Sequence, residues 1–338
     1  MRPTRTVSLL AAFLAALAIA GACGGGDGDE PGAEPEPATT TTTEPAVAPL
    51  TGLVDEGGAA ATRGPLSVKI DNANARRRPP QAGLEAADVV YEEPVEGATR
   101  FLAVFHSTLP ARIGPVRSTR FVDPGIVWPF GGLYVYSGGT ADKVAAIEAS
   151  PAQTLDETAL VAAGARERDP GLPAPHNLFV LPEALLAWEG VEDRSPPEPL
   201  FRYLDEGATF GGDPASLVVV PTLSRAQYRW DAAAGAWMRE ALNGGSGAPV
   251  PHLTESGAQV APQNVIVQRI AGVDDASVLV GEGPAWVCSQ GRCTAGLWRR
   301  AALEARTEWV GADGAEIRLA PGRTWVHLVT SGEPTITP

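Results

Sequence analysis

Charged and polar side chains gather in the first half of the chain, where predicted strands end and loops begin. Arg117 and Arg120 flank Ser118-Thr119 in a loop that starts with Gly-Pro. Two guanidinium groups at this spacing can grip a carboxylate or a phosphate in a bidentate manner. Alternatively, both arginines are solvated or bind loop carbonyls. The candidate ligand-binding residues are Asp71, Asn72, Glu92, Glu96, Arg100, Arg117, Arg120, His176 and Asn177.

Two carboxylates in this set suggest a second kind of chemistry. Glu92 ends a predicted strand and Glu96 follows four residues later. Glu92 with Glu96 or Asp71 could act as acid and base on a glycosidic bond, but sequence spacing does not give the separation that this reaction needs. The structural alternative is that Glu92, Glu96 and Arg100 form salt bridges across a hairpin. Hydrolysis of a cell-wall glycan or peptide therefore remains an alternative function.

No complete catalytic signature accompanies these residues, so we assign no catalytic residue and leave open whether the protein is an enzyme. Ser118 and Ser137 lack a Gly-x-Ser-x-Gly elbow, and the four histidines are scattered. The run 137–140 could bind an anion at a helix start, but it lacks the Gly-Lys-Thr ending of a phosphate loop. A tight turn into a helix capped by Thr140 is the simpler interpretation. The sequence indicates no cofactor and no metal.

The elements that must position these side chains are short strands. Alternation of apolar and polar residues predicts strands at 66–70, 88–92, 100–105 and 133–136. We expect the second and third of these to form an antiparallel pair. Helices are predicted from Ala141 and over 181–188.

The proline-rich run 196–199 is the predicted boundary between a domain at 50–195 and a domain at 196–338. Beyond it, turn signals recur at short intervals, which is typical of a mainly antiparallel β domain. Six of the eight tryptophans lie there, and they either fill the core or stack on a ligand. The predicted strands of this domain are 217–220, 226–230, 264–268, 277–280, 285–288, 297–300, 316–319 and 324–329.

Cys288 and Cys293 lie on either side of a Ser-Gln-Gly-Arg turn between strand-like residues. The two sulfurs should face each other across a hairpin, and this spacing favours a disulfide in an oxidising compartment. A zinc site would need two more ligands, and His252 and His327 are the only nearby histidines.

The first 22 residues have the pattern of a secretory signal peptide. Arg2 and Arg5 precede an apolar stretch that is too short for a stable membrane span. Small residues at 20–22 come directly before Cys23, an arrangement that resembles a bacterial lipobox. The resemblance implies cleavage before Cys23 and acylation of its thiol with diacylglycerol carrying fatty acids such as palmitate. An ordinary signal peptide with an incidental cysteine is the alternative.

Residues 23–49 are expected to be a disordered tether on this anchor. Residues 24–49 contain six acidic residues, no basic residue and five consecutive threonines, so they cannot bury apolar area. The formal net charge of the whole chain is -14. A strongly acidic chain is not steered toward nucleic acid, so we expect no nucleic-acid partner.

Several segments resemble the YerB-like bacterial lipoproteins. In the first domain they are SVKIDNANARRRPPQAGLEAADVVYEEPVEGATRFLAVF and ARIGPVRSTRFVD; in the second, RWDAAAGAWMREALNG, APQNVIVQR, GRCTAGLWRR and APGRTWVHL. The resemblance covers about residues 50–328 and implies an α/β (α+β) fold: a layered sandwich N-terminal domain and a smaller, mainly antiparallel β C-terminal domain. It also implies a lipid-anchored protein outside the cytoplasm, and it implies no reaction. The cysteine pair at 288 and 293 departs from the family pattern.

These observations predict a lipoprotein on the extracytoplasmic face of the bacterial cell membrane, held there by a diacylglyceryl anchor. The leading hypothesis is that the polar residues of the first domain form a cleft that binds a cell-wall fragment or an envelope protein. A wall hydrolase using Glu92 or Glu96 is the first alternative. A structural or assembly factor of the envelope, acting through the β-rich domain, is the second.

Overall fold

The computed structural model describes residues 46–58, 60–72, 80–192, 195–241 and 248–338. These residues all belong to one compact unit. Cys23 and the predicted signal peptide lie outside the described residues, as do all but the last four residues of the predicted tether.

Strands dominate the structure, and the helices are short. The helices are α1 (Asp123–Val127), α2 (Ala141–Glu148), α3 (Glu157–Ala162) and α4 (Pro182–Leu186), with 3-10 helices η1 (Leu84–Ala86) and η2 (Ala276–Leu279). The strands up to residue 219 are β1 (Leu66–Asn72), β2 (Val89–Val95), β3 (Ala98–Phe105), β4 (Leu133–Val135), β5 (Gln153–Leu155), β6 (Arg166–Arg168), β7 (Leu178–Val180), β8 (Asp213–Pro214) and β9 (Leu217–Val219). The later strands are β10 (Gln227–Asp231), β11 (Ala236–Ala241), β12 (Val250–Pro251), β13 (Asn264–Arg269), β14 (Gly281–Ser289), β15 (Arg292–Arg300), β16 (Glu308–Gly311), β17 (Thr324–Val329) and β18 (Thr335–Thr337).

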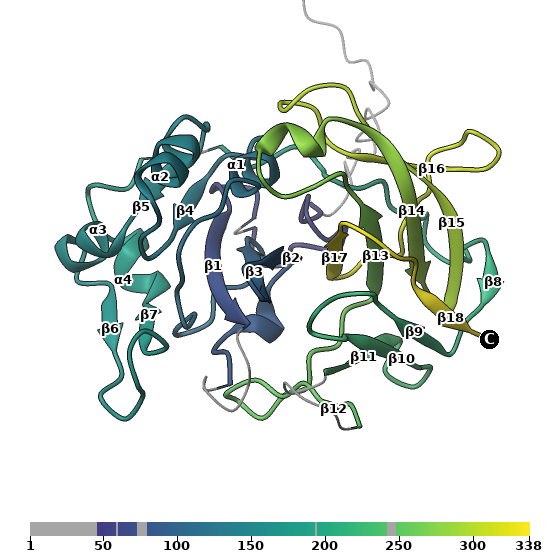
Figure 1. Ribbon diagram of the computed structural model, residues 1–338, viewed down its shortest axis with the longest axis horizontal. Coiled ribbons are helices and arrows are strands. Elements are labelled where there is room, and N and C mark those ends of the chain that lie inside the picture. Colours follow the sequence, from purple (N-terminus) through teal and green to yellow (C-terminus); the bar gives the residue numbers. More distant parts are fainter. Residues whose placement is uncertain (1–45, 59, 73–79, 193–194, 242–247) are drawn as a thin grey trace, which may run out of the picture. The chain divides into compact units, whose positions relative to one another are not determined.

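One large mixed sheet joins the two halves of the chain. Its strand order is β16-β15-β14-β13-β17-β2-β3-β1-β4-β5, with β8 paired to β15 as an eleventh strand. The strand β17 lies parallel to both β13 and β2, so C-terminal strands continue the sheet of the N-terminal strands (Figure 1). A smaller antiparallel sheet has the order β12-β11-β10-β9-β18. The predicted α/β class with a mainly antiparallel C-terminal part is confirmed, while the boundary at 195/196 stays a prediction.

The two faces of the large sheet pack into different apolar cores. Neighbouring residues of a strand point to opposite faces. Accordingly, Val90 and Phe101 belong to one buried cluster, while Tyr91 and Leu102 belong to the other. This alternation also decides which polar side chains of β1, β2 and β3 can meet.

Most predicted strands are present, and β2 and β3 form the predicted antiparallel pair. The strands predicted at 277–280 and 316–319 are wrong. The 3-10 helix η2 occupies the first segment, and the second forms only isolated bridges, at Glu316 and Leu319. The Asp275 carboxylate accepts the Ser277 N–H at 2.7 Å and caps that short helix, a local contact that apolar patterning does not reveal. The helix predicted over 181–188 is present but shorter, since α4 begins with Pro182.

Candidate functional site

A row of charged residues runs across three neighbouring strands. Asp71 on β1 lies opposite Arg100 on β3, and Arg100 lies opposite Glu93 on β2. Residues that pair directly across antiparallel strands share a face, so the three side chains lie on one side of the sheet. Glu92, one residue earlier, belongs to the other side.

Backbone hydrogen bonds hold the loop that contains Pro115 and Arg117 beside this row. Asp71 donates its N–H to the Pro115 carbonyl at 2.9 Å, and Arg117 donates to the Lys69 carbonyl at 2.8 Å. On the far side of the loop, Ser137 donates to the Arg117 carbonyl at 2.8 Å. The segment from 115 to 119 is therefore fixed between β1 and the end of β4, which places Arg117, and Arg120 directly after the segment, beside the row.

Three guanidinium groups converge here, and we call Arg100, Arg117 and Arg120 the arginine face. Arg100 and Arg120 both donate to the carbonyl oxygen of Ser118, at 2.9 and 3.3 Å. Arg117 places its Nε 3.7 Å from the Asp71 carboxylate, which also contacts Nδ1 of His176. The Asp71 carboxylate thus orients the side chains of both Arg117 and His176.

The turn between β2 and β3 supplies a negative charge, that of Glu96, next to the arginine face. This turn has two residues, Glu96 and Gly97, and Gly97 adopts φ 69°, which a side chain would disfavour. The Glu96 carboxylate accepts from Arg120 Nη2 at 2.8 Å and from Lys143 Nζ at 3.1 Å. Partial burial raises the pKa of Glu96, but its backbone amide, Lys143 and Arg120 outweigh this effect and lower the pKa to about 2.

The three guanidinium groups of the arginine face repel one another. Burial lowers the pKa of Arg100, and the charges of Arg120 and Arg117 lower it further, to about 10; Asp71 opposes this effect. Groups that disfavour one another's charge are stabilised when an anion binds between them. The arrangement can therefore hold a carboxylate or a phosphate.

A buried ionic cluster on the same side of the sheet was not predicted from the sequence. Lys69 contacts Glu93 and lies 2.7 Å from Asp123, and all three side chains are inaccessible to solvent. Tyr134 donates its hydroxyl to Asp123 at 2.6 Å. Burial and the neighbouring Asp123 raise the pKa of Glu93 to about 8, so Glu93 holds a proton at neutral pH. The signal that could have revealed it is a lysine in the middle of a strand whose flanking residues are buried.

Glu92 and Asn72 lie on the opposite side of the sheet from the arginine face. The Glu92 carboxylate has no exposed surface and accepts from Arg239 Nη2 at 2.8 Å and from the Thr99 hydroxyl at 2.7 Å. Asn72 donates to Glu92 at 3.3 Å. Burial raises the pKa of Glu92, but Arg239 and the neighbouring His327 outweigh it and hold the pKa far below its usual range.

The Glu92 network connects β2 to strands from the second half of the chain. Arg239 on β11 donates to the Tyr228 hydroxyl on β10 at 3.2 Å. That hydroxyl lies 2.8 Å from Nε2 of His327 on β17, and Nδ1 of His327 lies 3.3 Å from Glu92. Burial lowers the pKa of His327, so its ring is neutral at pH 7. These fully buried contacts tie the small sheet to the large one.

The remaining predicted residues do not join the arginine face. The Asn177 side chain accepts from Arg168 at 2.8 Å and donates to the Asp169 carbonyl at 3.3 Å, so it ties two stretches of chain together. Cys288 and Cys293 are directly paired across β14 and β15 and form a disulfide. Within the described residues, no group of three or more His, Cys, Asp or Glu side chains is placed to hold a metal ion.

Comparison with known proteins identifies the family. The N-terminal domain model described as a protein of unknown function (DUF3048) matches residues 50–195, and the corresponding C-terminal domain model matches residues 218–326. The chain therefore belongs to this two-domain family, as the resemblance to YerB-like lipoproteins predicted.

A sequence match and a structural match both carry the name that the resemblance gave. A Bacillus subtilis (strain 168) protein described as "Putative lipoprotein YerB" is 36% identical over 120 residues, which span 35% of each chain. The crystal structure of the YerB protein from Bacillus subtilis covers 87% of this chain and all of that one, with a TM-score of 0.72 and 24% identity. The structural match shows the shared fold. In the described part of the chain, no helix has the length and apolar character needed to cross a bilayer.

Proposed function

We propose that this protein is a lipid-anchored cell-envelope protein whose arginine face binds an anionic group. The ligand would be a fragment of the cell wall or an envelope protein that presents a carboxylate or a phosphate. The observation that carries the proposal is the convergence of Arg100 and Arg120 on one carbonyl oxygen, with Arg117 beside them. The chain as a whole is acidic, with a formal net charge of -14, so this cluster of cations is a local feature and not part of a basic surface.

The hydrolase alternative has less support from the geometry. Glu92 is fully buried and its pKa is far below its usual range, so it cannot hold a proton for a leaving group at neutral pH. Glu96 is exposed, but its ion pairs with Arg120 and Lys143 keep it ionised as well. The two carboxylates also belong to different sides of the sheet. The role of an assembly factor acting through the C-terminal part remains a second alternative.

Binding is tested by cosedimentation of the purified full chain, in detergent, with insoluble peptidoglycan. Two preparations, one retaining its phosphate-rich polymers and one stripped of them, separate phosphate from carboxylate ligands. We expect Arg117→Ala/Arg120→Ala to lose cosedimentation. The matched control, Arg229→Ala/Arg299→Ala, removes two half-exposed arginines elsewhere and should bind as the parent does. Equal binding by both double variants would refute the proposal.

The anchor is tested separately, in cells, with labelled palmitate. The parent chain should incorporate label and sediment with membranes, and Cys23→Ala should do neither. Cys288→Ser/Cys293→Ser is the matched control, because it changes cysteines that the disulfide already occupies. Membrane sedimentation of Cys23→Ala without label would sink the anchoring proposal and leave the arginine face untouched.

A further inference from the structure

An open pocket in the C-terminal part is bordered by a circuit of paired chain segments. The edge strand β16 pairs with β15, and Val310 in β16 bridges Glu316 on the returning chain. Farther on, Leu319 bridges Tyr203. The chain from Tyr203 returns to β15 by way of β8. The pocket inside this circuit has a volume of about 480 Å³, which is within the usual range of small-molecule sites.

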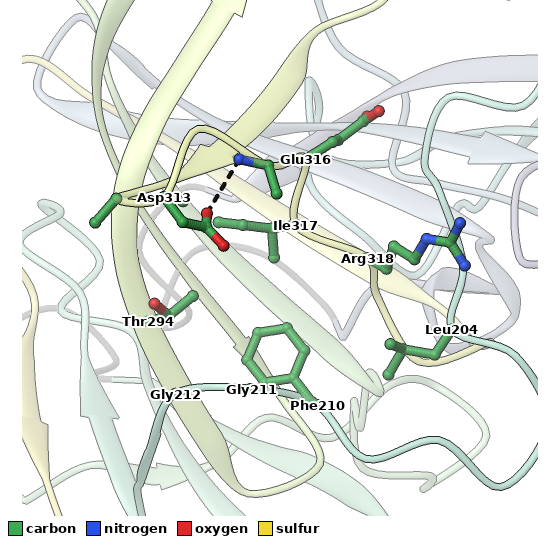
Figure 2. A pocket seen from close by; sticks show the side chains of 12 residues that line it. Leu204, Phe210, Gly211, Gly212, Thr294, Asp313, Glu316, Ile317 and Arg318 are labelled. Carbon is green, nitrogen blue, oxygen red and sulfur yellow. Dashed lines mark hydrogen bonds between the residues drawn. The ribbon is translucent and has the colours of Figure 1, made fainter.

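Apolar side chains and bare backbone form much of the pocket lining. Leu204, Phe210 and Ile317 supply apolar surface, and Figure 2 shows all three directed toward the space between the hairpin and the segment below it. Gly211 and Gly212 line the same space without side chains. The lining can therefore receive an apolar stem several carbons long.

Two of the three charged residues that line the pocket already have partners of opposite charge. Glu316 binds Arg306, with 2.8 Å between Oε2 and Nη2. Arg318 lies 3.4 Å from the Asp205 carboxylate. In Figure 2 the charged ends of Glu316 and Arg318 extend away from Asp313.

Asp313 is the third charged residue, and its charge is not compensated. One carboxylate oxygen, Oδ1, accepts the Ala315 N–H at 3.0 Å across the hairpin turn. Among the described residues, no nitrogen of a lysine, arginine or histidine lies within 4.0 Å of this carboxylate. In Figure 2 the carboxylate points toward Thr294 and Phe210. The uncompensated charge at the pocket is therefore negative.

We propose that this pocket binds a primary alkylammonium group, such as the side chain of lysine or of another diamino acid. The ammonium lies against the free Oδ2 of Asp313, and the methylene stem packs on Leu204 and Ile317. An exposed ion pair contributes little by itself, so the stem must contribute as well. Affinity then depends on both the positive charge and the length of the stem, and this double dependence distinguishes the site from a turn residue with an incidental charge.

The test titrates the purified full chain, in detergent, with methylamine, propylamine and pentylamine, followed by NMR shifts of the hairpin amides. We expect affinity to rise along the series, by up to about fourfold for each added methylene. Pentanol should bind about twofold to fivefold more weakly than pentylamine, which is the effect that an exposed ion pair supports, and pentanoate should bind more weakly than pentanol. Equal binding of pentylamine and pentanol, or no binding of any amine, would overturn the proposal.

Two variants locate the binding. Asp313→Asn keeps the oxygen that accepts the Ala315 N–H and removes only the charge, so the turn survives and pentylamine binding should fall about twofold to fivefold. Asp231→Asn is the matched control, because Asp231 accepts the Ala233 and Ala234 N–H groups in the hairpin between β10 and β11, outside the pocket. Leu204→Asn should weaken the dependence on stem length, because Phe210 and Ile317 remain in the lining. Unchanged binding by Asp313→Asn would refute the assignment. This outcome is independent of whether the arginine face binds an anion.

Discussion

Glu92 and Glu93 follow each other on β2, yet their carboxyl groups lie on opposite sides of the sheet and their pKa values are shifted in opposite directions. Glu92 faces Arg239, whose charge holds it ionised. Glu93 shares a single ammonium, that of Lys69, with Asp123, so one of the two carboxyls keeps a proton. One strand thus places an ionised carboxylate in the contact between the two sheets and a protonated one in the cluster on the arginine-face side.

Glu93 should make the protein less stable as the pH rises. Its pKa is about 8 in the folded chain and about 4.5 for an unperturbed glutamate, so the folded state holds the extra proton between these values. Its contribution to stability is fully present below about pH 4.5 and is lost as the pH rises through about 8. We expect the free energy of unfolding, measured in urea, to decline over this range in the parent and to decline less in Glu93→Gln. Identical pH profiles would contradict the assignment.

Glu92 should show the opposite dependence. Its pKa is lowered by Arg239, so its contribution is present above about pH 4.5 and is lost as the pH falls through the lowered value. At pH 7, Glu92→Gln leaves the buried Arg239 charge unpaired and should destabilise the chain by about 3–5 kcal/mol. The double variant Glu92→Gln/Arg239→Met should recover part of this loss in urea unfolding. A cost below about 1 kcal/mol for the single variant would show that the pair is not buried in solution.

The sequence predicted the strands around the candidate site better than it predicted which side chains meet there. Apolar alternation located β1, β2 and β3, and their pairing follows from the short turn at Glu96-Gly97. Asp71, Arg100, Arg117 and Arg120 do come together because strand register and one loop place them there. Side chains along a strand alternate between the two faces of the sheet, so a difference of one residue decides which face a side chain occupies. Glu92 and Glu93 are neighbours in sequence and therefore lie on opposite faces.

The parts that were missed depend on contacts between distant segments. Lys69 and Asp123 are 54 residues apart, and the strand pattern gives no sign that they share a buried cluster. Likewise, Glu92 and Arg239 are 147 residues apart and meet because the small sheet, which carries Arg239 on β11, packs against the face of the large sheet that carries Glu92.

The disulfide between Cys288 and Cys293 should stabilise the chain modestly. It closes a short loop across a hairpin whose strands β14 and β15 are already paired, so chain entropy gives only about 2 kcal/mol. We expect Cys288→Ser/Cys293→Ser to lower the free energy of unfolding in urea by about this amount. Adding a reductant should destabilise the parent similarly and leave the variant unchanged. A larger effect of reductant on the variant would contradict this account.

Glu96 should compete with any anion for the arginine face. Its carboxylate occupies Arg120 and Lys143, so an incoming carboxylate or phosphate must displace it or share the two cations. We expect Glu96→Gln to bind peptidoglycan about twofold to tenfold more tightly than the parent, while Arg120→Gln binds more weakly. Stability should change by less than about 1 kcal/mol in Glu96→Gln, because the ion pairs are at the surface. If Glu96 were instead the acid of a hydrolase, the same variant would lose release of soluble wall fragments without tighter binding, so one substitution separates the two functions.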